Sequence, residues 1–93
     1  MDNTELEFDQ ELELKEAISN LQDDIDSLEL CLSETREIMA IIVNKEGNSS
    51  ESLDKYKKLY LQLENQKAQH TKILSNYRSG LAKLEREVNS RPY

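Results

Sequence analysis

The sequence has few of the residues that cross-link a small domain, bind a metal or form tight turns. Its 93 residues include one cysteine, one histidine, one proline, two glycines and no tryptophan. A lone cysteine forms no intramolecular disulfide, and one cysteine with one histidine is too few for a zinc or iron–sulfur ligand set. Two glycines and one proline also leave too few turn residues for a β-sandwich or a β-barrel.

Long apolar runs and an excess of basic over acidic residues are missing as well. No stretch approaches the roughly 20 apolar residues of a membrane-spanning helix, and the acidic residues 1–10 do not resemble a signal or transit peptide. The net charge of −7 argues against nucleic acid as the main ligand. No nucleophile–base pair, phosphate-binding loop or cofactor motif is present. We therefore expect an intracellular protein, cytoplasmic or nuclear, without membrane insertion, cofactor, small-molecule ligand or enzymatic activity.

What the sequence does contain is an apolar residue at every third or fourth position along most of its length. In this frame 17 of 20 positions from 14 to 42 and from 53 to 88 are apolar, whereas the 37% apolar composition predicts about 7. The polar exceptions are Thr35, Lys67 and His70. Such a 3.5-residue repeat is typical of coiled-coil helices. The predicted helix seam consists of Leu14, Ile18, Leu21, Ile25, Leu28, Leu32, Met39, Ile42, Leu53, Tyr56, Tyr60, Leu63, Leu74, Tyr77, Leu81, Leu84 and Val88.

The pattern predicts one all-α unit over residues 1–93, built from two long heptad helices. The first spans about residues 4–44, with Thr4 and Glu7 forming a capping box. A turn at about residues 45–51 follows, and the second helix runs over about residues 52–89, capped by one of three serines, Ser49, Ser50 or Ser52. Residues 90–93 form a loose tail.

Two architectures fit this pattern, because the heptad frame continues through the turn. An antiparallel helical hairpin pairs Leu32 with Leu63 and Ile42 with Leu53, which puts the midpoint at the Gly47–Asn48 turn. Residues 1–46 carry a net charge of −11 and residues 47–93 a net charge of +4, which favours pairing the two halves with each other. A continuous rod remains the alternative, since isoleucine at a positions with leucine at d positions is typical of parallel dimers. We favour the hairpin.

In the hairpin register the polar breaks of the second helix meet an acidic segment of the first. Lys67 and His70 fall opposite Leu28 and Ile25, within residues 23–29, which hold four carboxylates. A cation at a seam position that reaches a flanking carboxylate fixes the register at some cost in stability. For His70 this role competes with that of a pH switch.

The apolar stripe is wider than a two-helix seam requires, so we expect the hairpin to pack into a larger helical bundle. The partner is then a second copy of the chain or a different helical subunit. Tyr56, Leu59 and Tyr60 near the turn form an alternative contact patch. The candidate partner-contact residues are Leu6, Phe8, Leu12, Cys31, Ile38, Leu59 and Ile73.

The sequence gives only weak indications of a reactive thiol, a metal site or a phosphorylation site. Cys31 lies among carboxylates that suppress its thiolate, so we expect a packed small hydrophobe in place of a reactive thiol. Asp23, Asp24 and Asp26 lack the glycine and terminal glutamate of a calcium loop and predict a solvated acidic face. The serines of residues 49–52 form a weak phosphorylation pattern at a helix N-terminus.

These features predict a non-enzymatic structural or interaction protein, a small coiled-coil subunit of a larger multiprotein assembly. In size and heptad pattern the chain resembles the small helical subunits of kinetochore, spindle, tethering and lysosome-related complexes, a likeness that rests on no motif. The alternative is a stand-alone homodimeric helical bundle that binds a client through its acidic first helix, as a regulator or a chaperone-like protein.

Overall fold

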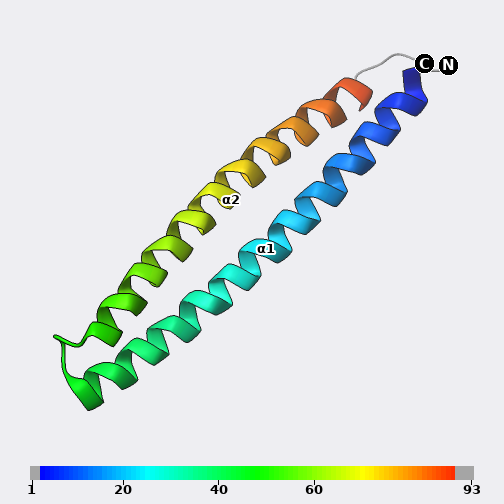
Figure 1. The fold of residues 1–93 in the computed structure, drawn as a ribbon. Helices are drawn as coiled ribbons and strands as arrows, with labels where there is room; N and C mark the ends of the chain where they lie inside the picture. Colours follow the sequence, from blue (N-terminus) through cyan, green and yellow to red (C-terminus); the bar gives the residue numbers. More distant parts are fainter. Residues whose placement is uncertain (1–2, 90–93) are drawn as a thin grey trace.

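The chain folds as two long helices packed side by side in opposite directions. This computed structural model describes the backbone of residues 3–89 and the side chains of residues 9–87. Helix α1 spans Asn3–Glu46 and helix α2 spans Glu51–Asn89. The helices lie antiparallel, with the turn at one end and the first and last described residues at the other (Figure 1). The predicted all-α hairpin is confirmed, and the continuous rod is excluded.

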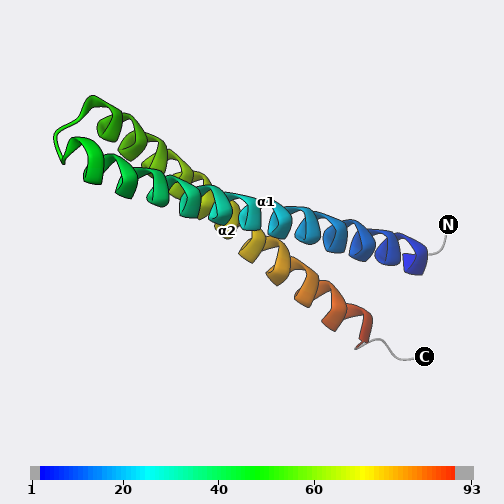
Figure 2. The same ribbon diagram turned by 90° about the horizontal axis from the view of Figure 1, so that it is seen from below.

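The hairpin is narrow and elongated. Its principal extents are 69 × 16 × 14 Å, and its radius of gyration is 20.6 Å. A compact domain of this length has a radius of gyration of about 12 Å. The length follows from the 44-residue helix α1, because each helical residue adds about 1.5 Å. Seen from below, the two helices cross near their middles (Figure 2). They pack against each other and form the only pair of elements in the described part of the chain.

Helix α1 ends where the backbone reaches Gly47. This glycine has a φ of +84°, a left-handed conformation that side chains disfavour. Its N–H donates a hydrogen bond of 3.0 Å to the carbonyl of Val43, which is the bond of a glycine-terminated helix. Lys45 and Glu46 therefore remain helical, although the sequence placed them in the turn. Lys45 in the last turn also suits the negative end of the helix dipole.

Helix α2 begins with Ser50 as its N-cap. The Ser50 hydroxyl accepts a 3.0 Å hydrogen bond from the backbone N–H of Leu53, three residues later. Glu51 and Asp54 supply negative charge in the first turn, where the helix dipole favours it. The turn thus contains only residues 47–50, and Glu51 is the first helical residue, one earlier than the sequence indicated.

The core lies along the seam between the helices. Ile25, Leu32, Leu53 and Leu74 are buried, with exposed fractions between 2% and 6%, and no described apolar side chain falls below 2%. Tyr77 is at the border of the seam, 39% exposed, and Val88 lies outside the described side chains. The other predicted seam residues are half-buried: Leu14, Ile18, Leu21, Leu28, Met39, Ile42, Tyr56, Tyr60, Leu63, Leu81 and Leu84.

Thr35 is the one polar residue buried in the described part of the chain, at 5% exposed. Its hydroxyl donates a 2.7 Å hydrogen bond to the carbonyl of Cys31, one turn earlier. The polar break in the first helix is therefore satisfied within that helix and needs no partner on α2. Within residues 3–89, neither helix holds a stretch apolar enough to cross a membrane.

Candidate functional site

The hairpin has two long sides on which residues of both helices meet, and they differ in chemistry. We call one the polar face. Its groove is lined from α1 by Leu32 and Arg36 and from α2 mainly by polar side chains. The polar face consists of Gln22, Glu29, Arg36, Glu64, Lys67, Thr71 and Arg78.

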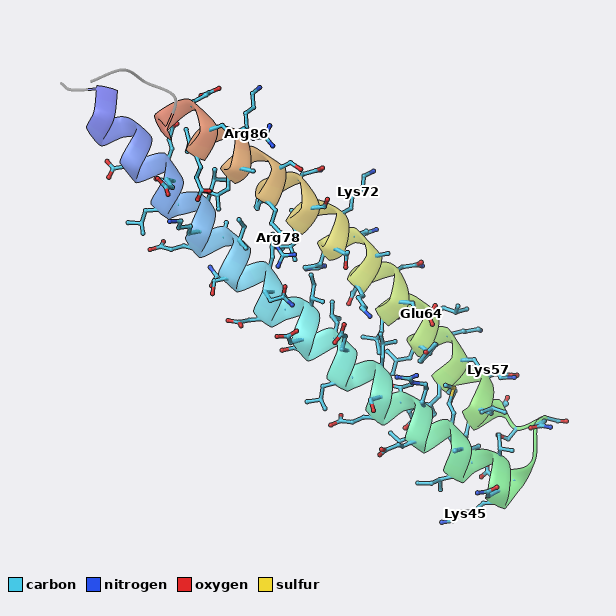
Figure 3. The ribbon with its side chains drawn as sticks, turned by 180° about the vertical axis from the view of Figure 1, so that it is seen from behind. Lys45, Lys57, Glu64, Lys72, Arg78 and Arg86 are labelled. Atoms are coloured by element: carbon cyan, nitrogen blue, oxygen red, sulfur yellow. The ribbon has the colours of Figure 1, made fainter. Side chains whose placement is uncertain are left out.

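Side chains on the polar face connect the two helices directly. The Lys67 ammonium lies 3.2 Å from a carboxylate oxygen of Glu29. Arg78 extends from α2 toward α1 and donates a 3.0 Å hydrogen bond to the side-chain oxygen of Gln22 (Figure 3). Gln22 in turn donates to Asp26 over 3.1 Å. The prediction that Lys67 reaches a carboxylate within residues 23–29 is confirmed, and the Arg78–Gln22–Asp26 chain is an additional contact.

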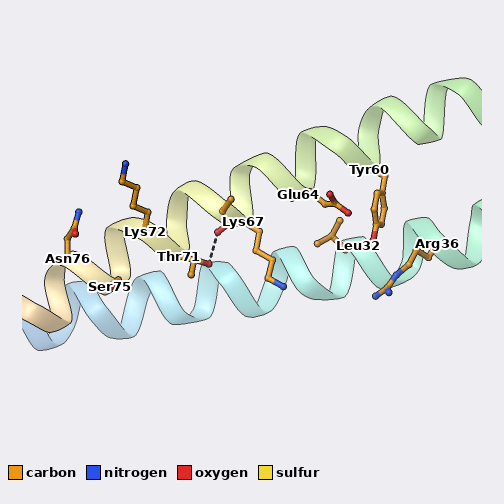
Figure 4. A pocket seen from close by; sticks show the side chains of 10 residues that line it. Leu32, Arg36, Tyr60, Glu64, Lys67, Thr71, Lys72, Ser75 and Asn76 are labelled. Atoms are coloured by element: carbon orange, nitrogen blue, oxygen red, sulfur yellow. Dashed lines mark hydrogen bonds between the residues drawn. The ribbon is translucent and has the colours of Figure 1, made fainter.

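A close view of the polar face shows how differently its lysines lie. Lys67 extends toward α1, whereas Lys72 and Asn76 point away from it (Figure 4). The Thr71 hydroxyl donates a 2.7 Å hydrogen bond to the backbone carbonyl of Lys67 (Figure 4). Since Lys67 comes from a seam position, its charge holds the register of the hairpin against Glu29.

The polar face carries a second ion pair nearer the end of the hairpin opposite the turn, which we call the open end. The Lys15 ammonium lies 3.0 Å from a carboxylate oxygen of Glu11, one turn away on α1. This hydrogen bond and its charge raise the pKa of Lys15 above the ordinary value of 10.5, and the charge of Glu85 on α2 adds to the rise. The Lys15 side chain is 54% exposed, so the contribution of its raised pKa to folding is small and is lost as the pH rises through that pKa.

The opposite side presents apolar side chains to solvent. A groove there is lined by Asp24, Leu28 and Cys31 of α1 and by Gln66 and His70 of α2. Residues seven positions apart share a helix face, so Ile38 lies on the same side as Cys31. By the same spacing Leu59 and Ile73 lie on either side of Gln66, and Ile41 is one turn beyond Ile38. All five apolar residues are exposed, and we call this the apolar face: Cys31, Ile38, Ile41, Leu59 and Ile73.

The candidate contact residues thus divide by position. Cys31, Ile38, Leu59 and Ile73 share the apolar face. Leu12 is 48% exposed and stands apart, on the outer surface of α1. Leu6 and Phe8 lie outside the described side chains. The sequence reasoning missed Ile41, which a second stripe at Cys31, Ile38 and Ile41, beside the seam, would have revealed.

Two other residues are more exposed than the apolar face itself. Leu30 and Leu61 are 61% and 60% exposed, on the outer surfaces of α1 and α2. Singly exposed leucines are ordinary on protein surfaces, whereas apolar residues grouped across two helices indicate contact. The predicted tyrosine patch is divided: Tyr56 and Tyr60 are half-buried in the seam, and only Leu59 lies open to solvent.

Cys31 and His70 differ from expectation in their surroundings. The Cys31 thiol is free and lies exposed in an open groove, so the expectation that it packs as a small hydrophobe is wrong for the hairpin alone. His70 lines the same groove as Asp24, but its ring Nδ1 makes a local 2.7 Å hydrogen bond to the Gln66 carbonyl. Among the described residues, no group of three or more acidic, histidine or cysteine side chains is arranged to hold a metal ion.

Comparison of the chain with protein-family models, with curated proteins and with solved structures finds no match in any of the three.

Proposed function

We propose that this chain is a non-enzymatic interaction protein, a small helical subunit that completes its core by packing the apolar face against another helical chain. In this proposal the heptad seam behaves as a coiled coil, and the hairpin becomes part of a larger helical bundle within a multiprotein assembly. Neither nucleic acid nor a small molecule is a ligand, and the protein acts inside the cell, in the cytoplasm or the nucleus.

The incomplete core supports this proposal most strongly. The accessible surface is 7295 Å², whereas a compact monomer of this mass exposes about 5,500 Å². Only Ile25, Leu32, Leu53 and Leu74 are buried among the described apolar residues. A two-helix hairpin with one buried stripe is marginal alone, because a small core gives little stability. Burying the apolar face against another helix would supply the missing contacts.

The test compares Ile38 and Leu30, two exposed aliphatic residues that lie on different surfaces of α1. Ile38→Glu places a charge on the apolar face, and Leu30→Glu places the same charge on the outer surface. We expect Ile38→Glu to abolish association with the partner chain, measured by sedimentation velocity, because a desolvated charge opposes packing. Leu30→Glu is expected to leave the sedimentation coefficient unchanged. Where the unsubstituted chain forms a complex, an Ile38→Glu variant that forms the same complex would contradict the proposal.

A further inference from the structure

We propose that the chain packed on the apolar face is a second copy of this one, arranged with the two turns side by side at the same end. This proposal rests on the proposed function, since it names the partner that completes the core. The two-fold axis of the dimer runs parallel to the long axis of the hairpin. Helix α1 of each copy then lies against α2 of the other, and all neighbouring helices in the four-helix bundle are antiparallel.

Two face-to-face arrangements are compatible with two-fold symmetry. In an isologous dimer the same surface patch is used on both copies. An axis parallel to the helices brings α1 against α2 of the second copy and puts the turns together. An axis perpendicular to the helices, within the interface, brings α1 against α1 and puts the turns at opposite ends.

The charges of the two helices favour the first arrangement. Residues 1–46 carry a net charge of −11 and residues 47–93 a net charge of +4. On the side of the apolar face, α1 contributes Glu13, Asp24, Glu34 and Lys45, a net charge of −2, and α2 contributes Lys55, Lys83 and Glu87, a net charge of +1. Pairing α1 with α1 would bring carboxylates together, whereas pairing α1 with α2 brings carboxylates to lysines.

The position of the apolar residues favours the same arrangement independently. Four of the five residues of the apolar face, Cys31, Ile38, Ile41 and Leu59, lie in the half of the hairpin that contains the turn, and Ile73 lies just beyond the middle of α2. The other half of this side is mostly polar, with Glu13 and Lys83 among its residues. Two copies with their turns side by side bring apolar halves into contact. Copies with turns at opposite ends would bring each apolar half against a polar half.

The proposed dimer also places oppositely charged residues at the same level along its long axis. Cys31 and Gln66 line one groove and so lie level with each other across the hairpin. Counting from them toward the open end, Glu13 and Lys83 are nearly level as well, and both side chains are exposed. Glu13 of each copy then lies beside Lys83 of the other.

The accessible surface of the chain is also large enough for such an interface. Its 7295 Å² exceeds the surface of a compact monomer of the same mass by about 1,700 Å², whereas each partner buries roughly 800 Å² in a standard interface.

A distance between the two turns tests the arrangement. A spin label is attached to Asn48→Cys, in the exposed turn, after Cys31→Ser has removed the native thiol. Pulsed electron paramagnetic resonance is expected to give an interchain distance shorter than half of the 69 Å length of the hairpin. A dimer whose label distance approaches that full length would overturn the arrangement.

The mass of the unsubstituted chain, measured in parallel by light scattering, separates the two proposals. A dimer is the expected result. A poorly helical monomer, or a mixture of masses, overturns the second copy as the partner but leaves the proposed function standing. A fully helical, stable monomer overturns both, because its core would then need no other chain.

A charge exchange provides a second test that separates contacts between copies from contacts within one. Glu13→Lys and Lys83→Glu each place like charges beside one another and are expected to weaken the dimer about two- to fivefold per contact. Mixing the two variants restores opposite charges only across the interface, so heterodimers should form in preference to either homodimer. Lys72→Glu, on the outer surface of α2, is the control and should leave association unchanged. Statistical mixing of the two variants would overturn the pairing of α1 with α2.

Discussion

The two sides of the hairpin differ in the side chains that they present. On the polar face, Lys67 pairs with Glu29 and Arg78 with Gln22, so the contacts between α1 and α2 are polar and specific in register. On the apolar face, Ile38 and Leu59 lie open to solvent. Polar contacts define which residues lie opposite each other, but they add little stability in water. One side therefore carries the polar contacts that set which residues lie opposite each other, and the other is the surface that we propose packs against a further chain.

The largest effect is expected when the seam beneath both faces is broken. Ile25→Asp buries a carboxylate at a seam position that is only 5% exposed. We expect a loss of about 3–5 kcal/mol, which is enough to unfold a hairpin of this size. Circular dichroism during thermal melting measures this loss. An unchanged melting curve would show that Ile25 is not part of the core.

A smaller effect is expected from a charge on the apolar face. Leu59→Glu and Leu61→Glu introduce the same charge two residues apart on α2, but only Leu59 belongs to the apolar face. Leu59→Glu should weaken association at least tenfold, about 1.4 kcal/mol, while the Leu61 variant keeps the affinity of the unsubstituted chain. Sedimentation equilibrium measures both constants. If the Leu61 variant weakened association more, the apolar face would be assigned to the wrong side.

The smallest effect is expected on the polar face. A double-mutant cycle with Lys67→Met and Glu29→Gln should give a coupling free energy of about 0.2–1 kcal/mol, because the two side chains are 37% and 54% exposed and water screens their charges. Raising the salt concentration should reduce this coupling by screening the charges. Chemical denaturation of the four proteins provides the values. A coupling that does not change with salt would mean that the pair acts through packing and not through charge.

Much of the fold could be predicted from the sequence because its signals are local and periodic. The 3.5-residue repeat gave the two helices, and Gly47 with the opposite charges of the two halves gave the hairpin. The helix ends were displaced by one or two residues, since the last helical residue depends on where the left-handed conformation of Gly47 falls. Ser50 was one of three possible caps, and only its bond to the N–H of Leu53 distinguishes it.

The two faces were harder to predict than the seam. Cys31, Ile38, Leu59 and Ile73 were recognised because each flanks a seam position. Ile41 was missed because it lies one step further from the seam, where apolar residues have no fixed heptad role. The bond between Arg78 and Gln22 was missed for a different reason. Long side chains reach several residues along the partner helix, and sequence spacing does not give their conformations.

The most direct test of the central claim is to measure mass and helicity together while the purified chain is diluted. Light scattering gives the mass, and circular dichroism on the same samples gives the helical content. If the apolar face completes the core, helical content should fall as the complex dissociates, because the hairpin alone buries few apolar side chains. A monomer that stays fully helical and melts cooperatively at every concentration would contradict the claim.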